Sequence, residues 1–274
     1  MNQQKHIHHY HRHMSISYPV SLRQRVYSLV LFPLVLLALA FFIISRLGGH
    51  QAAQIVNVSW GFVISALVIT FTRLLLAYAL ALILAIPLAL LIEHNQRAEK
   101  IFLPLFDVMQ SVPVLAFFPV VIVFFVHYNL YNSAAIFILL ITMMWSIIFS
   151  VVGGLRVIPQ DIKDAARVFH ITGWQYWRKV LLPGVFPYIV TGSLLAWAGG
   201  WNIIIVAEVL HTYIPGGNSG QDLFGIGSLL VAASAGAQQK VFFMALFALV
   251  VVVAVLNLFV WQKLLKYAER YKFE

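Results

Sequence analysis

The chain has 274 residues, of which 62% are hydrophobic and only 10% are charged, and its formal net charge is +9. This composition is far more apolar than that of an ordinary soluble domain, so the sequence predicts a membrane protein. The absence of cysteine excludes disulfides, thiol catalysis and zinc sites with cysteine ligands.

Residues 1–25 form a polar segment that holds five of the ten histidines, His6, His8, His9, His11 and His13. Imidazole is a common metal ligand, so metal binding is one interpretation. The other is a disordered cytoplasmic tail without fixed geometry, and we favour it, so we expect neither a metal site nor a cofactor. The apolar run after the tail is too long for a signal peptide.

Six apolar stretches follow, and each has at least 19 residues. They are 26–44, 60–92, 101–126, 133–155, 181–210 and 241–262. A membrane span requires about 20 residues, so each stretch can cross a bilayer. The sequence therefore predicts an all-α, multi-pass membrane protein with about six transmembrane helices and with both termini on one side. We divide it into a tail (1–25), a first helix with its outer loop (26–58) and a core of five helices (59–274).

Two charged residues, Arg73 and Glu208, lie well inside these stretches. A charge near the bilayer centre costs about 2.5–3.5 kcal/mol on insertion scales, so both should face protein or water. The second and fifth stretches run in opposite directions, which places both residues in the outer half, at depths where they could pair. A purely structural ion pair and a role in a gate or substrate path are both open.

The third stretch contains Ser111 and Pro113, followed by Pro119. A proline removes a backbone donor and interrupts the helix, so we expect a broken span near a translocation path.

Residues 153–187 form a polar island between the fourth and fifth stretches. Its pattern is typical of a short helix, a sharp turn and a second short helix. His170 should end the first helix, because histidine tolerates a left-handed backbone. Thr172 and Gln175 have the spacing of a capping box, so a second helix should begin at Gly173.

The basic residues predict the orientation. Fifteen of the 18 Lys and Arg residues lie on the side of the termini and the island, whereas only Arg46 and Lys240 lie on the opposite side. Positive loops face the cytoplasm, so the termini and the island are expected there. The positive charge then reflects topology, and nucleic-acid binding is excluded.

The island resembles the cytoplasmic coupling loop of ABC importer permeases, whose pattern is Glu-Ala-Ala, then a Gly, then Leu-Pro. Asp164-Ala165-Ala166 stands at the first position and Leu182-Pro183 at the last, with the family's spacing. Two residues depart from the pattern. Asp164 replaces the usual Glu, and His170 replaces the usual Gly, with a Gly only at 173.

Other segments are similar to permeases for nitrate, sulfonates and taurine. The third stretch has their Ser-x-Pro…Ala…Pro pattern, and the fifth has an Ala-Glu pair, Ala207-Glu208, after a Trp. The resemblance runs from about Ser59 to the C-terminus and implies the type I ABC importer permease fold in the inner plasma membrane of a prokaryote. It also implies a small anionic solute, such as nitrate, a sulfonate, taurine or bicarbonate.

By this resemblance the chain is the transmembrane permease subunit of an ATP-driven solute importer. The resemblance implies three kinds of partner besides membrane lipid: an ATP-binding cassette subunit, an extracytoplasmic solute-binding protein that meets the outward loop 211–240, and a second permease chain, most simply an identical one. The expected coupling residues lie in the loop 153–183; they are Asp164, Ala165, Ala166, Arg167, His170, Gly173, Leu182 and Pro183. Arg73, Ser111, Pro113 and Glu208 are candidates for the translocation path or gate.

The chain has no phosphate-binding loop, no His-Glu-x-x-His and no Gly-x-Ser-x-Gly. We therefore expect that it is not an enzyme and that a separate subunit hydrolyses ATP. A nucleotide-independent channel or secondary transporter would also explain six spans, but not the spacing of the island. An intramembrane hydrolase would require a nucleophile and a base within the spans, and the six stretches contain no histidine.

Overall fold

The structure is a computed structural model that describes residues 58–94, 96–214, 216–217 and 219–272. The polar segment 1–25 and the first expected span, 26–44, lie outside the described residues. The described part of the chain contains helices and no strand, which confirms the all-α class.

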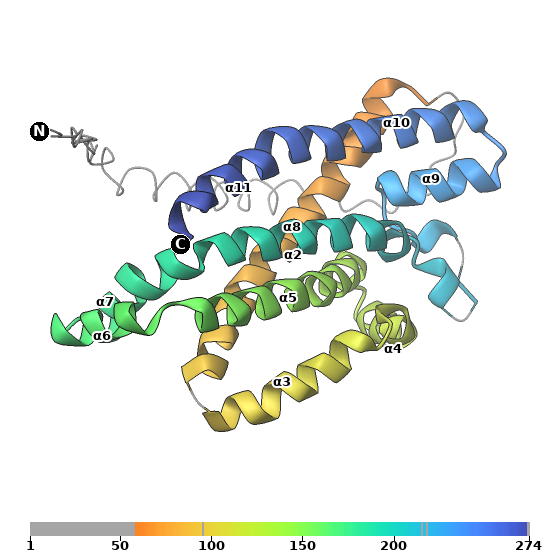
Figure 1. Ribbon diagram of the computed structural model, residues 1–274. Coiled ribbons are helices and arrows are strands. Elements are labelled where there is room, and N and C mark those ends of the chain that lie inside the picture. The colour runs from red at the N-terminus through yellow and green to blue at the C-terminus, as the bar shows by residue number, and fades with distance from the viewer. Residues whose placement is uncertain (1–57, 95, 215, 218, 273–274) are drawn as a thin grey trace, which may run out of the picture.

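The described chain consists of long helices and of short helical turns (Figure 1). In chain order they are α2 (Trp60–His94), α3 (Gln96–Ser111), α4 (Val114–His127), α5 (Tyr131–Val157), α6 (Gln160–Val168), α7 (Gly173–Tyr176), the π-helical turn η1 (Trp177–Leu181), α8 (Leu182–Glu208), the 3₁₀ turns η2 (His211–Tyr213) and η3 (Ser219–Gln221), α9 (Ile226–Ala235), α10 (Gln239–Leu256), the π-helical turn η4 (Asn257–Trp261), α11 (Gln262–Ala268) and the 3₁₀ turn η5 (Glu269–Tyr271).

Among the described residues, four continuous helical segments are long and apolar enough to cross a membrane. They are Trp60–Ile92, Tyr131–Val157, Trp177–Glu208 and Gln239–Tyr271. The bent pair α3–α4 adds a fifth if it forms one span. These segments account for five of the six stretches expected from the sequence.

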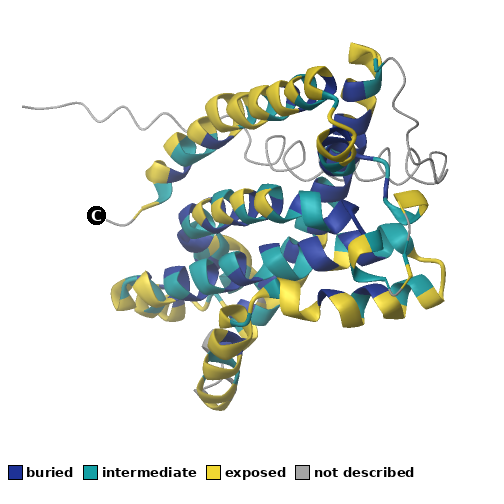
Figure 2. Ribbon diagram, turned by 90° about the vertical axis from the view of Figure 1, so that its right-hand side faces the viewer, coloured by how far each residue is buried: buried dark blue, intermediate teal, exposed yellow. Residues whose placement is uncertain are grey.

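The core consists of α2, α5 and α8, with α5 packed along both of the others (Figures 1 and 2). On α2, four fully buried alanines recur at every fourth residue, at positions 77, 81, 85 and 89. That spacing places them on one face of the helix, and small side chains there let a neighbouring backbone approach closely. In the most apolar 18 residues of the α5 span, half of the residues are buried inside the molecule. This share is larger than in the other three continuous spans of the described chain.

The contact between α5 and α8 also depends on glycine. A Cβ at Gly192 of α8 would lie 2.7 Å from the Ser150 Cβ and 3.0 Å from the Ser146 carbonyl oxygen on α5. By contrast, a Cβ at Gly153 of α5 would meet no atom within 4 Å. Gly192 is therefore required for close packing, and Gly153 is not.

The third expected span is helical but sharply bent. Glu99–Ser111 and Val114–His127 meet at 89°, and Pro113 stands immediately before α4 with φ −55° and ψ 125°. In Figure 1 α3 is seen along its length while α4 is seen nearly end-on. The break expected at Ser111–Pro113 is confirmed, and it turns the chain almost at a right angle.

The last span, Gln239–Tyr271, is the least buried of the continuous spans. Only 17% of its most apolar 18 residues are buried inside the molecule. Its outer surface forms an exposed band in Figure 2. The π-helical turn η4 changes the register of the side chains, and Trp261 is buried there while the three residues before it are exposed.

The stretch 211–240 contains more structure than the loop expected from its Gly, Ser and Asn content. It contains α9, whose residues Ile226, Leu229, Leu230 and Ala233 are buried. They pack with Val63, Ala66 and Leu67 of α2 and with Val241 and Ala245 of α10. A ten-residue helix is too short to stand out as a span, which is why the apolar pattern did not predict it.

Gly192→Ala and Gly153→Ala test the helix contact with the same chemical change. We expect Gly192→Ala to destabilise the chain by about 1–3 kcal/mol because it overpacks the α5–α8 contact. Gly153→Ala should be neutral or stabilising by up to about 1 kcal/mol, since alanine favours a helix. The thermal unfolding midpoints of the purified variants in detergent measure the difference; equal midpoints would contradict the close contact.

Candidate functional site

The polar island folds as α6, a tight turn and α7. His170 has φ +51°, so it adopts the left-handed conformation expected for the end of the first helix. The Ile171 N–H donates to the Ala166 carbonyl (2.9 Å) and the His170 N–H donates to the Arg167 carbonyl (3.0 Å). These two bonds form a Schellman motif, with His170 at the position that glycine usually takes. Because His170 fulfils this role, the missing family glycine does not prevent the turn.

The expected coupling residues differ in exposure. Ala166 is buried against the rest of the molecule, whereas Asp164, Ala165 and Arg167 are more accessible, with the Asp164 and Arg167 side chains 53% and 75% exposed. Arg167 Nη1 donates to Asp164 Oδ1 at 2.8 Å across one turn of α6. Such a surface pair contributes little to stability. Asp164 and Ala165 are thus accessible to another molecule, and Ala166 is not.

The exposed end of α6 is apolar. Val168 and Phe169 are each 75% exposed, although both are large hydrophobic residues in a polar segment. The sequence pattern does not single them out, because the exposure of a side chain is set by the folded chain. Two exposed apolar side chains beside the tight turn form a small surface suited to contact with a partner protein.

The second helix of the island begins at Gly173, as expected, but it is not short. It continues without a break through α7 and η1 into α8, which ends at Glu208. The predicted loop 153–183 therefore includes helical residues at both of its ends. Residues 153–157 belong to α5, and Leu182-Pro183 lie inside a continuous helix.

The opposite end of α8 carries a buried ion pair. Arg73 Nη1 lies 2.6 Å from Glu208 Oε1, and the two side chains are 4% and 0% exposed. Thr70 donates a hydrogen bond to the same oxygen (2.7 Å), and Arg73 Nε donates to Asn132 Oδ1 (2.9 Å). The pairing that the sequence left open is thus present, and it joins α2, α5 and α8.

Glu208 also holds α9 in place. Its Oε2 accepts a hydrogen bond from the Gly227 N–H (2.8 Å), and Thr70 Oγ1 accepts one from the Ile226 N–H (2.8 Å). A carboxylate at a helix N-terminus is favoured because the helix dipole is positive there. A Cβ at Gly225 would collide with the Glu208 carboxylate, so the close approach requires glycine. We call Thr70, Arg73, Asn132, Glu208 and the α9 N-terminus the buried polar network.

A second polar contact, which is partly buried, joins α2 and α8 nearer the middle of both helices. The Tyr78 hydroxyl donates to Ser193 Oγ at 2.8 Å. The Trp197 ring, one turn further along α8, packs against Tyr78 with ring centroids 5.7 Å apart. The relative position of α2 and α8 is therefore fixed by polar contacts at two depths.

The remaining candidate residues, Ser111 and Pro113, lie at the exposed elbow between α3 and α4. Ser111 Oγ donates to the Asp107 carbonyl within α3 (2.7 Å). Within the described chain neither residue contacts the buried polar network. The four candidate residues for a path or gate therefore lie at two separate sites, the elbow and the network. Sequence reasoning missed Thr70 and Asn132; the three-residue spacing of Thr70 and Arg73 on one helix face was the available signal for Thr70.

Comparison with known proteins provides an independent result. Residues 81–266 match the family described as binding-protein-dependent transport system inner membrane component. The chain is 34% identical over 147 residues to the bicarbonate transport system permease protein CmpB of Synechococcus elongatus, covering 54% of this chain and 52% of that protein. It is 32% identical over 196 residues to the nitrate import permease protein NrtB of Leptolyngbya laminosa, covering 63% and 69%.

A more distant relative is the glycine betaine/proline betaine transport system permease protein ProW of Escherichia coli, which is 27% identical over 166 residues. That match covers 60% of this chain and 45% of the relative. The chain thus spans about half the length of several curated relatives that it matches. The family match includes α6, the tight turn and all of α8, but it begins after Arg73.

Glu208→Gln tests the buried polar network. The variant keeps the shape of the side chain but leaves the Arg73 guanidinium buried without a countercharge. Removing one partner of a buried ion pair costs about 3–5 kcal/mol, so we expect a large fall in the thermal unfolding midpoint in detergent. Arg73→Gln combined with Glu208→Gln should recover most of the loss, because two neutral amides can hydrogen-bond. An equal loss in the single and double variants would refute a specific pair.

Proposed function

The chain belongs to the family of binding-protein-dependent transport system inner membrane components, and we propose that it is the permease subunit of an ATP-driven importer of a small anion. As a member of this family with several apolar spans, it is a multi-pass membrane protein. We place both termini and α6 in the cytoplasm, because fifteen of the 18 Lys and Arg residues then lie on that side.

The observation that carries the proposal is the exposed end of α6. Asp164 and Ala165 are accessible, and Val168 and Phe169 present apolar surface next to them. The tight turn at His170 holds this surface in one orientation. We infer that it packs into a groove of an ATP-binding subunit, with Phe169 as the apolar anchor and Asp164 at the polar rim.

The continuous helix from Gly173 to Glu208 supports a mechanical role for the loop. At 1.5 Å per residue it extends for about 50 Å, enough to cross the bilayer. If the ATP-binding subunit moves α6, the movement would pass directly to α8. The helix that begins in the island at Gly173 is the one that ends at Glu208. The buried polar network would then transmit the movement to α2 and α9.

We infer that Arg73 and Glu208 act in a gate and not as a binding site for the anion. The Arg73 guanidinium is already bonded to Glu208 and Asn132, so binding an anion would require it to leave a buried partner. The elbow at Ser111–Pro113, bent by 89°, is our candidate for the hinge of the path. We propose that a second copy of the chain completes the path and that a solute-binding protein docks at the α9 end.

Nitrate and bicarbonate are the first solutes to test, because the names of two relatives contain them. The family match of this chain includes α6 and α8. The alternative function, a channel or secondary transporter that does not use nucleotide, would leave the exposed end of α6 without a partner.

Phe169→Ser tests docking on the ATP-binding subunit. We expect it to reduce co-purification of that subunit with the full chain at least tenfold, because an apolar interface anchor is lost. Ile101→Ser, which changes a 65% exposed residue near the start of α3, is the matched control and should leave co-purification unchanged. Quantitative mass spectrometry of the purified complexes measures the ratio. Loss in both variants, or in neither, would contradict docking through α6.

Transport itself tests the proposed function. Proteoliposomes that contain the chain with its ATP-binding and solute-binding subunits should accumulate labelled nitrate or bicarbonate only when ATP is present. Without ATP the accumulated amount should fall to that of empty vesicles. Uptake that proceeds equally without nucleotide would favour the channel or secondary transporter.

A further inference from the structure

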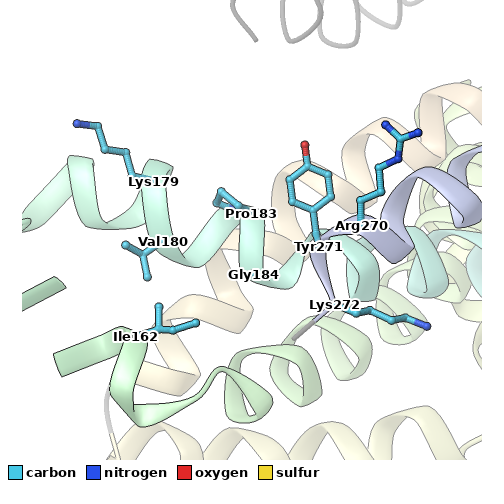
Figure 3. A pocket seen from close by; sticks show the side chains of 8 residues that line it. All are labelled: Ile162, Lys179, Val180, Pro183, Gly184, Arg270, Tyr271 and Lys272. Atoms are coloured by element: carbon cyan, nitrogen blue, oxygen red, sulfur yellow. The ribbon is translucent and has the colours of Figure 1, made fainter. Parts of the chain in front are cut away.

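An open cavity of about 320 Å³ lies between the polar island and the C-terminal end of the described chain. On one side it is lined by α6, η1 and the start of α8, and on the other by η5 and the residue after it (Figure 3). The lining residues are Ile162, Lys179, Val180, Pro183, Gly184, Arg270, Tyr271 and Lys272. The described lining residues thus include three cations and no carboxylate.

The cations do not all point the same way. In Figure 3 the side chains of Lys179, Tyr271 and Arg270 extend toward the top of the view, while Lys272 extends toward the lower right. Arg270 is partly held in place, because its guanidinium lies 5.8 Å from the centre of the Tyr267 ring. Lys179 and Arg270 therefore stand at opposite ends of the cavity lining in Figure 3, on two elements that are far apart in the sequence.

An aromatic cluster shows at which depth the cavity lies. The Tyr271 ring packs against Phe186 of α8 and Tyr267 of α11, with ring centroids 5.4 Å and 5.6 Å apart. The two hydroxyls of Tyr267 and Tyr271 are 3.0 Å apart. Tyrosines at the end of an apolar span mark the headgroup level of a bilayer. The cavity thus opens where the phosphate groups of lipids are found.

We propose that this cavity binds the phosphate group of an anionic phospholipid, with Lys179 and Arg270 as the charged ligands and the apolar residues Val180 and Pro183 beside the lipid's glycerol region. Basic pockets between transmembrane helices on the cytoplasmic side recognise such headgroups. The inference uses the membrane orientation of the proposed function but does not depend on transport. It adds a ligand that is not the solute.

Such a lipid would act on the coupling loop. It would bridge η1, which continues into α8, and the C-terminal η5, which packs on α8 through the contact of Tyr271 with Phe186. A bound phosphate neutralises cations that otherwise repel each other across the cavity. The position of the island relative to the last span would therefore depend on the anionic lipid content of the membrane.

Native mass spectrometry of the full chain, titrated with phosphatidylglycerol, tests the site. Each cation near a membrane surface contributes about fivefold in affinity, so Lys179→Gln combined with Arg270→Gln should weaken binding roughly 25-fold. Arg178→Gln combined with Lys266→Gln removes the same charge from neighbouring positions outside the cavity lining and should change it less than about twofold. Lys179→Arg combined with Arg270→Lys should retain binding, and phosphatidylcholine should bind at least tenfold more weakly.

Three results would overturn the proposal. An equal loss in the control double variant would mean diffuse attraction between charges without a site. Phosphatidylcholine carries the same phosphate beside a choline cation, so equal affinity for it would mean that the net negative charge of the lipid is not recognised. Displacement of phosphatidylglycerol by millimolar inorganic phosphate would identify the ligand as a soluble anion. The measurement requires no ATP-binding subunit, so it gives the same answer whether or not the chain transports a solute.

Discussion

The Glu208 carboxylate is the constraint on which the arrangement of the helices depends. It is fully buried, and both of its oxygens are used: Oε1 accepts from Arg73 and Thr70, and Oε2 accepts from the backbone of α9. A charge in an apolar interior is tolerated only with such partners, so the partners must come to it. One side chain thereby determines where α2, α8 and α9 meet, and Asn132 extends the contact to α5 through Arg73.

The same helix that ends in Glu208 begins in the polar island, at Gly173. This continuity gives the molecule a direct mechanical connection between its two polar regions, which lie at opposite ends of the helix. The glycine and alanine positions on α2 and α8 allow the helices to pack closely, so a shift of α8 must be accommodated by its neighbours. An importer requires such a connection, whereas a channel does not.

The sequence predicted the features that depend on local chemistry. Apolar length predicted the spans, the conformational tolerance of histidine predicted the turn at His170, and the depths of Arg73 and Glu208 allowed their pairing. It did not predict what depends on tertiary packing. The burial of α9, the 89° angle at Ser111–Pro113 and the uninterrupted helix through Pro183 are set by contacts between distant segments. Val168 and Phe169 were missed because exposure is a property of the folded chain.

The central claim is that ATP acts on the α9 end through α6 and α8, and a distance measurement tests it most directly. The chain has no cysteine, so Tyr128→Cys and Lys240→Cys, two exposed positions just after α4 and near the start of α10, can carry spin labels without further changes. In the importer assembled with its ATP-binding and solute-binding subunits, the account predicts that ATP shifts the distance between the labels and that Phe169→Ser abolishes the shift. The same distance with and without ATP, in a complex that hydrolyses ATP, would contradict it.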